Sequence, residues 1–247
     1  NAETKYLLDR FSYPEPQRLT DARVTLGEVV MDPPSCTSPD TTIFESLQQM
    51  QQYNRTYCGV VDENKKLIGF LTKSDISVIG LYDTARSIEI MSRTPLENFR
   101  KTLDGRILYD DPEMKLNGKV SVIAMTEESK LKNYDVADRI VVCGNDPQAQ
   151  KAVIEMGAGM LIVVWAQEVT DQVLAAAKAR HCPILLSGHG GMNTLRYIYF
   201  SPSVSQIMKT ELVSFRTQEL AEDVGRKMLQ SRYHVYPVTQ ADGTLFG

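Results

Sequence analysis

Polar and apolar positions follow a helical spacing after residue 42 and a strand spacing soon afterwards. Thr42 and Glu45 fit the capping box that begins a helix. The apolar residues on one face of that helix are Ile43, Leu47 and Met50. Two apolar runs, 57–61 and 67–72, come next and are separated by the polar residues 62–66. This segment therefore predicts a helix followed by a β-hairpin.

The same series of elements recurs 178 positions later. The matching residues are Met50, Val60, Leu67 and Gly69 in the first copy and Met228, Val238, Leu245 and Gly247 in the second. Thr217 is expected to cap the second helix, whose apolar stripe is Leu220, Val224 and Met228. Strands are predicted at 235–239 and from 244. The first copy continues beyond Gly69 as far as Ile76, so we expect the sequence to be a piece of a longer chain.

Residues between the two copies have a different pattern, in which apolar runs alternate with helical segments. The runs are 119–125, 139–143, 160–165 and 183–187, and such runs are typical of strands buried on both faces of a sheet. Asp146 and Pro147 are expected to begin a helix that ends near Met156, and a second helix is expected at about 170–179. The short connections predict right-handed crossovers and a mostly parallel sheet.

Two loops at the carboxyl ends of these strands are candidate ligand loops, because open parallel sheets bind ligands at that edge. The loops are 144–146 and the glycine-rich 187–191. Neither continues as a phosphate-binding P-loop, and 188–191 lacks a dinucleotide fingerprint. The glycines equally suit sharp turns and close packing, so both interpretations remain open.

Composition narrows the class of protein. The chain has 247 residues, 43% of them hydrophobic, which is enough for sizeable cores, and no apolar run approaches the roughly 20 residues of a membrane span. The charged amino end does not resemble a secretory signal, so we expect a cytoplasmic protein. The 27 basic and 31 acidic residues form no basic cluster, which argues against nucleic acid as a partner.

The cysteines are expected to be reduced and buried. Cys36, Cys58, Cys143 and Cys182 lie far apart, without the spacing of metal ligands. The sequence therefore predicts neither a disulfide framework nor a metal site.

Several motifs resemble two known domain families. The run 69–75, Gly-Phe-Leu-Thr-Lys-Ser-Asp, and the Val-Val-Asp at 60–62 resemble the CBS domain. The middle block resembles the DRTGG domain in three places: 144–150, with Gly-Asn-Asp and two glutamines, 157–159, Gly-Ala-Gly, and the turn and helix at 187–196. The basic residue that follows the glycine in that signature is absent. The order CBS, DRTGG, CBS is similar, over nearly the whole chain, to the regulatory insert of family II inorganic pyrophosphatases.

This resemblance implies an α/β fold, in which a CBS-domain pair of β-α-β-β-α units carries an inserted three-layer DRTGG-type domain with a mostly parallel sheet. The expected parts are a linker from a catalytic domain at 1–20, a first CBS domain at 21–84, the DRTGG-type domain at 85–198 and a truncated second CBS domain at 199–247. A homodimer through the CBS domains is also implied.

The resemblance assigns catalysis to a part of the parent enzyme that this chain lacks. The catalytic half of such pyrophosphatases carries an Asp-His-His triplet, whereas His181, His189 and His234 are not arranged in that way. We therefore assign no catalytic residue and no metal ligand here, and manganese or cobalt would belong only to the missing catalytic domain.

Paired CBS domains of this family bind adenine nucleotides, so AMP, ADP, ATP and diadenosine polyphosphates are the expected effectors. In the first copy Thr72 would donate a hydrogen bond to phosphate, and Asp75 would accept hydrogen bonds from ribose hydroxyls. The start of the helix near Asp75 also favours an anion. The same spacing equally describes a simple helix cap.

The second copy offers Arg232 for phosphate and Tyr233, His234 or Tyr236 for stacking on the base, as in the Arg-Tyr-x-x-x-Pro-Val stretch of these pyrophosphatases. Strand alternation would place Tyr233 with Val235 on one face and His234 with Tyr236 on the other. The alternative is a surface arginine beside core tyrosines. Further candidates by resemblance are the side chains of Asn54 and Arg55 and the backbone groups near Cys36, Thr37, Val213 and Ser214.

Two other functions compete with nucleotide sensing. In one, the CBS clefts are empty and the chain is a dimerisation scaffold, with Arg232 paired to a carboxylate. In the other, the middle block is an enzyme that uses Cys143 or His189 as nucleophile or base. Nucleotide binding in the clefts would distinguish both from a sensor.

Overall fold

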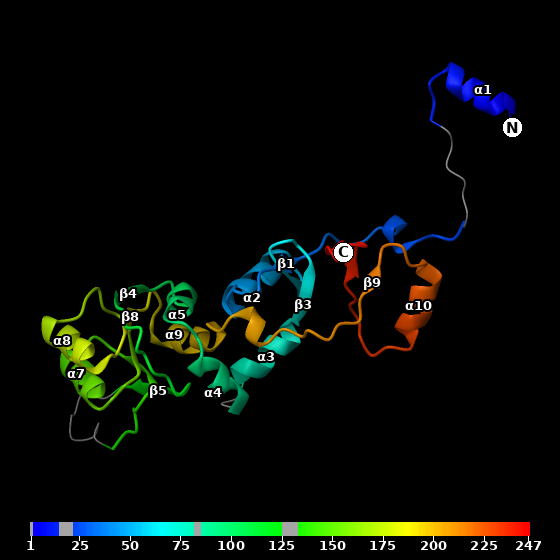
Figure 1. The fold of residues 1–247 in the computed structure, drawn as a ribbon. Coiled ribbons are helices and arrows are strands. Elements are labelled where there is room, and N and C mark those ends of the chain that lie inside the picture. The colour runs from blue at the N-terminus through cyan, green and yellow to red at the C-terminus, as the bar shows by residue number, and fades with distance from the viewer. Residues whose placement is uncertain (1, 15–21, 82–84, 125–132) are drawn as a thin grey trace.

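A computed structural model of the chain describes residues 2–14, 22–81, 85–124 and 133–247, arranged as three units in a row (Figure 1). The unit in the middle of the row is a three-stranded sheet of β1 (Cys36–Thr37), β2 (Tyr57–Val61) and β3 (Leu67–Thr72). β1 is parallel to β2, and β2 and β3 form the predicted hairpin with the predicted bounds. α2 (Ile43–Gln52) connects β1 to β2, and α3 (Lys73–Leu81) follows β3 directly.

The capping box at the start of α2 is confirmed. The N–H of Glu45 donates to Thr42 Oγ1 at 3.1 Å, and the N–H of Thr42 donates back to the Glu45 carboxylate at 2.9 Å. Ile43 and Met50, on the predicted apolar face, are fully buried against Leu71 of β3. The capped helix is thus held on the hairpin by the side chains that its pattern singles out.

A second unit with the same order of elements consists of β9 (Phe215–Arg216), α10 (Ala221–Leu229) and β10 (Val238–Thr239). In the first unit Thr37 pairs with Val60. In the second, the residues 178 positions later, Phe215 and Val238, pair in the same parallel way. The repeat is therefore present in strand register as well as in sequence.

Two details of the second unit were predicted wrongly. Thr217 does not cap α10, because it continues the pairing of β9 with β10: its N–H donates to Thr239 of β10, and its carbonyl accepts from Gly27 of the amino-terminal segment, both at 2.9 Å. α10 begins after Leu220 without a side-chain cap. The strand predicted at 235–239 is only β10, because β9 has two residues and offers partners to no more than two.

The third unit is a five-stranded sheet in the order β4-β8-β7-β6-β5. Its parallel strands are β5 (Val120–Ile123), β6 (Ile140–Cys143), β7 (Met160–Val163) and β8 (Ile184–Leu186). All four lie within the predicted runs, although Met125, the end of the first run, falls outside the described residues. β4 (Arg106–Tyr109) pairs antiparallel with β8 at the sheet edge and was not predicted.

Helices cover both faces of this sheet, as the buried strands require. α7 (Pro147–Glu155) and α8 (Asp171–Arg180) contact each other and share one core with the sheet. α5 (Leu96–Thr102), α9 (Gly191–Tyr197) and the 3-10 turn η2 (Ile198–Phe200) share the core on the other face. Asp146 caps α7 by accepting from the N–H of Gln148 at 3.0 Å, and Thr170 caps α8.

The chain passes from the first unit into the third through α4 (Ala85–Ser92) and returns through the 3-10 turn η3 (Val204–Gln206). On its return, the Pro202 carbonyl accepts from the Ile43 N–H at 2.9 Å, and the Thr41 carbonyl accepts from the Val204 N–H at 2.9 Å. At the amino end lie α1 (Ala2–Arg10) and the 3-10 turn η1 (Leu26–Glu28). Within the described ranges, no helix is long and apolar enough to cross a membrane.

Candidate functional site

A cavity of about 400 Å³ lies between the two repeat units. Four segments form its walls: the start of β2, β3 with the start of α3, the connection at 209–213, and the loop at 232–237. The complete lining is Thr56, Tyr57, Phe70, Thr72, Lys73, Ser74, Lys209, Glu211, Leu212, Val213, Arg232, Tyr233, His234, Val235 and Pro237. Its volume is within the range of small-molecule sites, about 300–1,000 Å³.

The cavity combines an aromatic surface with positive charge. The rings of Tyr57 and Phe70 stack with their centroids 5.6 Å apart and their planes 19° apart. The charged lining residues are the cations Lys73, Lys209 and Arg232 and the single carboxylate Glu211. A ligand with a planar apolar ring and a negative group would therefore find complementary surfaces in this cavity.

The wall at the start of α3 carries the predicted pair Thr72 and Asp75. The Thr72 hydroxyl donates to Asp75 Oδ2 at 2.6 Å, and the N–H of Asp75 donates to Thr72 Oγ1 at 3.2 Å. These are the contacts of a helix cap, the alternative that the spacing also allows. Thr72 lines the cavity, whereas Asp75 lies behind it, beside a neighbouring smaller cavity.

Lys209 connects this wall to the next one. Its N–H and carbonyl both bond to Phe70 of β3, each at 2.9 Å, and its Nζ lies 2.7 Å from Asp75 Oδ1. Burial of Asp75 opposes ionisation, but hydrogen bonds from Lys209 and Thr72 outweigh burial and hold the pKa of Asp75 below its usual value. The ammonium of Lys209 is thus held at the rim of the cavity by an ionised carboxylate.

The loop at 232–237 brings Arg232, Tyr233 and His234 to the same cavity, all three of them exposed. Within the described part of the chain, Arg232 forms no ion pair with a carboxylate, so its guanidinium is available at the cavity surface. This arrangement differs from that of the empty scaffold, in which Arg232 would be paired.

The predicted division of this loop into two faces is wrong. Because residues 231–237 are not a strand, Tyr233, His234 and Val235 line the cavity together. Tyr236 does not line it: its ring packs on Phe215 with the centroids 5.4 Å apart, and its hydroxyl donates to the Tyr233 carbonyl at 2.8 Å. Tyr236 therefore supports the shape of the loop from behind.

Of the remaining candidates, all but Val213 lie away from this cavity. Arg55 forms an ion pair with Asp32 at 2.5 Å, beside Asn54, whose backbone has a positive φ of 50°. The Cys36 carbonyl accepts from Gln49 Nε2 at 2.8 Å, and Thr37 Oγ1 lies 3.1 Å from Ser46 Oγ. Val213 does line the cavity, whereas Ser214 lines a separate one with residues of the second unit.

Several lining residues were not singled out from the sequence, among them Tyr57, Phe70, Lys73, Ser74 and Lys209. Lys73 and Ser74 follow Thr72 directly in the Gly-Phe-Leu-Thr-Lys-Ser-Asp run. Their place in this motif is a signal from which they could have been predicted as site residues. Nothing in the local sequence of Lys209 pairs it with Phe70.

The geometry does not favour an enzyme built on the middle block. Burial raises the pKa of the Cys143 thiol to about 12, so it is a thiol and not a nucleophilic thiolate at neutral pH. His189 contacts the ring of Tyr197 edge-on, with centroids 5.1 Å apart. His181 bonds to Asp111 at 3.1 Å, and His234 lies at the inter-repeat cavity. No group of three metal-ligating side chains occurs among the residues that the structure describes.

Comparison with known families agrees with this architecture. The CBS domain model matches residues 26–79, and the DRTGG domain model matches residues 98–199. The chain is therefore a protein with a CBS domain and a DRTGG domain, and its mixed α/β units and mostly parallel sheet are those of that class.

Two curated relatives match almost the full chain. One is the cobalt-dependent inorganic pyrophosphatase of Clostridium perfringens, 29% identical over 247 residues, which are 99% of this chain and 45% of that protein. The other, from Thermotoga maritima, is named "Probable manganese-dependent inorganic pyrophosphatase" and is 24% identical over 99% of this chain and 44% of that protein. The chain thus spans less than half the length of these relatives.

A solved structure is similar to the whole arrangement. It contains the CBS and DRTGG domains of the regulatory region of the Clostridium perfringens pyrophosphatase, in complex with its activator diadenosine tetraphosphate. The TM-score is 0.78 with 26% identity, over 91% of this chain and 98% of the solved one. This chain is therefore similar to the regulatory region of a pyrophosphatase, and the similarity extends over nearly all of that region.

Proposed function

We propose that this chain is the adenine-nucleotide-sensing region of an inorganic pyrophosphatase. AMP, ADP, ATP or a diadenosine polyphosphate occupies the cavity between the repeat units and controls the hydrolysis of pyrophosphate by a catalytic domain outside this chain. The manganese or cobalt ion belongs to that catalytic domain. The observation that carries the proposal is the meeting of Thr72 and Ser74 with Arg232 and Tyr233 around one cavity.

Each wall has a role in this proposal. The adenine ring lies against the aromatic surface of Tyr57 and Phe70 or against Tyr233, and Arg232 and Lys73 bind the phosphate through charge-assisted hydrogen bonds. Ser74 supplies a neutral hydrogen bond. Thr72 does not donate to the phosphate as expected from the sequence, because its hydroxyl and its N–H both donate to Asp75. Because Lys209 reaches both the cavity and Asp75, a phosphate near it competes with that carboxylate for the ammonium.

Control of an enzyme requires a ligand with different affinities for two conformations. The cavity wall includes residues of both repeat units, so ligand contacts are gained or lost when the two units shift relative to each other. The proposal also includes a homodimer formed through the CBS units and a cytoplasmic location. The outcome of the binding experiment depends on neither of them.

Isothermal titration of the chain with AMP, ADP, ATP and diadenosine tetraphosphate tests the proposal. We expect saturable binding of at least one of them, and Arg232→Ala should weaken it by about 10- to 100-fold, which corresponds to loss of a charge-assisted hydrogen bond. Arg226→Ala is the matched control, because Arg226 lies on α10 of the same unit, paired with Glu222 and away from the cavity.

Two results would contradict the proposal. Absence of heat with all four nucleotides would favour the empty scaffold. Equal weakening by Arg232→Ala and Arg226→Ala would mean that the second unit had been damaged as a whole and that the cavity is not the site.

A further inference from the structure

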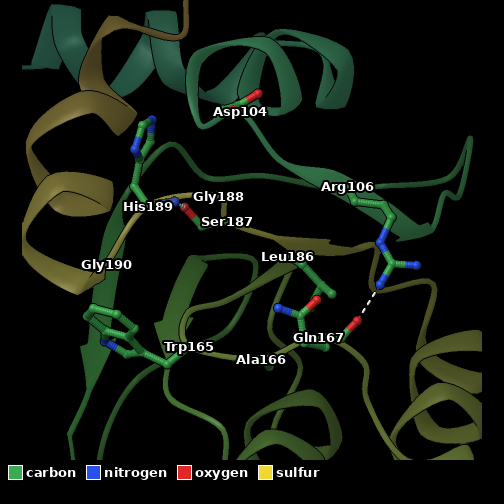
Figure 2. Close-up of a pocket in the computed structure, with 10 residues that line it drawn as sticks. All are labelled: Asp104, Arg106, Trp165, Ala166, Gln167, Leu186, Ser187, Gly188, His189 and Gly190. Carbon is green, nitrogen blue, oxygen red and sulfur yellow. Dashed lines mark hydrogen bonds between the residues drawn. The ribbon is translucent and has the colours of Figure 1, made fainter.

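A second cavity, of about 390 Å³, lies in the DRTGG unit at the carboxyl ends of β7 and β8 (Figure 2). The loop after β7 leads to α8 on one face of the sheet, and the loop after β8 leads to α9 on the other. Because the two loops diverge, they leave a crevice between them. Crevices of this origin are where open α/β sheets bind ligands.

The backbone around this cavity is unusual. Trp165, in the loop after β7, has a φ of 62°, and Asp104, on the other side, has a φ of 44°. A left-handed backbone is a true outlier for a residue as bulky as tryptophan, and such outliers cluster at functional sites. Trp165 is also 77% exposed, so burial of its indole does not account for the conformation.

Three different chemical groups surround the cavity. Figure 2 shows Trp165, Asp104 and Arg106 on separate sides of the floor formed by Leu186 and the following loop. The Arg106 guanidinium donates to the Gln167 carbonyl, which fixes its position. In the described ranges, neither Arg106 nor Asp104 takes part in an ion pair, so a cation and a carboxylate are both available to a ligand.

The loop that forms the floor is held rigidly. Ser187 Oγ lies 2.7 Å from Thr194 Oγ1, and the Thr194 hydroxyl also donates to the His189 carbonyl at 3.2 Å. A Cβ on Gly188 would lie 2.2 Å from the Asp104 carbonyl, and one on Gly190 would lie 2.5 Å from the indole of Trp165. Only glycine fits at 188, where the obstacle is backbone, whereas a side chain at 190 would displace the exposed indole. The loop and the segment at Asp104 are therefore positioned together before any ligand arrives.

From this combination we propose that the DRTGG unit binds a nucleoside monophosphate in the crevice, as a second site separate from the cavity between the repeats. The base stacks on the exposed indole of Trp165, the phosphate pairs with Arg106, and the ribose hydroxyls donate to Asp104. An aromatic platform, a cation and a carboxylate on three sides match the three parts of such a ligand.

The chain contains a single tryptophan, so its fluorescence reports on this crevice alone. The test is acrylamide quenching of Trp165 during titration with AMP, GMP, CMP or UMP, in the Arg232→Ala background that weakens binding in the other cavity. We expect at least one of them to protect Trp165 in a saturable way. Arg106→Ala should weaken that protection about tenfold, and inorganic phosphate without a ring should give none.

Arg180→Ala serves as the matched control, because Arg180 is an exposed arginine at the end of α8 in the same unit and does not line the crevice. No protection by any of the four nucleotides at millimolar concentration would overturn the proposal. So would protection that is present in the wild-type chain and lost with Arg232→Ala, because the signal would then come from the other cavity. The quenching result in the Arg232→Ala background therefore tests the crevice separately from the cavity between the repeats.

Discussion

Asp75 shows how one side chain serves both local structure and the cavity. It caps α3 through Thr72 and holds the Lys209 ammonium 2.7 Å away. Its pKa is lowered in the folded chain, because these hydrogen bonds outweigh the effect of burial. A carboxyl with a lowered folded-state pKa stabilises the fold above its ordinary pKa of about 4, and this contribution is lost as the pH falls through the folded value.

Asp75→Asn should therefore lower the free energy of unfolding by about 1 kcal/mol at pH 7, because the amide keeps the shape but loses the charge. The difference from the wild-type chain should shrink well below pH 4, where the wild-type carboxyl is also neutral. Urea unfolding of both chains at pH 7 and well below pH 4 measures this difference in unfolding free energy. Asp40→Asn, at an exposed carboxylate, should have little effect at either pH, and a constant difference for Asp75→Asn would contradict the assigned role of the charge.

Sequence reasoning found the site residues whose neighbours in the chain carry the signal. Thr72 lies in a continuous motif, and Arg232 lies in a short run of aromatic residues. Lys209 was missed, since its position depends on a bridge to Phe70 that joins distant parts of the chain. Tyr57 and Phe70 were missed although they lie in the predicted hairpin, since only the stacking of their rings makes them a surface of the cavity. The position of Tyr236 depends on Phe215 in the same way.

At the scale of elements, α7 depends on a cap that was read correctly from the sequence. Asp146 accepts from the N–H groups of Gln148 and Ala149, at 3.0 and 3.5 Å, and Pro147 occupies the first turn. Asp146→Ala should lower the free energy of unfolding by about 1 kcal/mol, the usual effect of losing an N-cap. Asp110→Ala, at an exposed residue of the same unit, should change it by less than about 0.5 kcal/mol. The measurement is urea unfolding. Equal losses of unfolding free energy for the two variants would show that loss of the cap does not cause the effect of Asp146→Ala.

The strands were predicted well where both faces are buried and poorly elsewhere. β6 and β7 are buried at every residue, so they read as continuous apolar runs. β4 lies at the sheet edge, partly exposed, and begins with Arg106, so neither alternation nor a long apolar run marked it. β10 is shorter than its apolar run because its partner β9 ends after two residues.

At the scale of the whole molecule, a nucleotide bound between the repeats should stabilise the two units together, because its contacts come from both. At a free concentration 100 times the dissociation constant, the stabilisation should be about 2.7 kcal/mol. Thermal unfolding with and without the nucleotide measures it. Arg232→Ala at the same nucleotide concentration should show a clearly smaller increase in Tm, and an equal increase would mean that the nucleotide binds elsewhere.

The DRTGG unit meets the first repeat unit where the chain leaves and returns. Asn98 Nδ2 donates to Ser203 Oγ at 2.9 Å, although the two residues are 105 positions apart in sequence. The two ends of the unit therefore lie side by side, as they do in a domain that is inserted into a loop of another domain. The unit could therefore be excised and replaced by a short linker while the two repeats keep their pairing. The architecture is modular, because the inserted unit has its own sheet and its own cores, separate from those of the two repeat units.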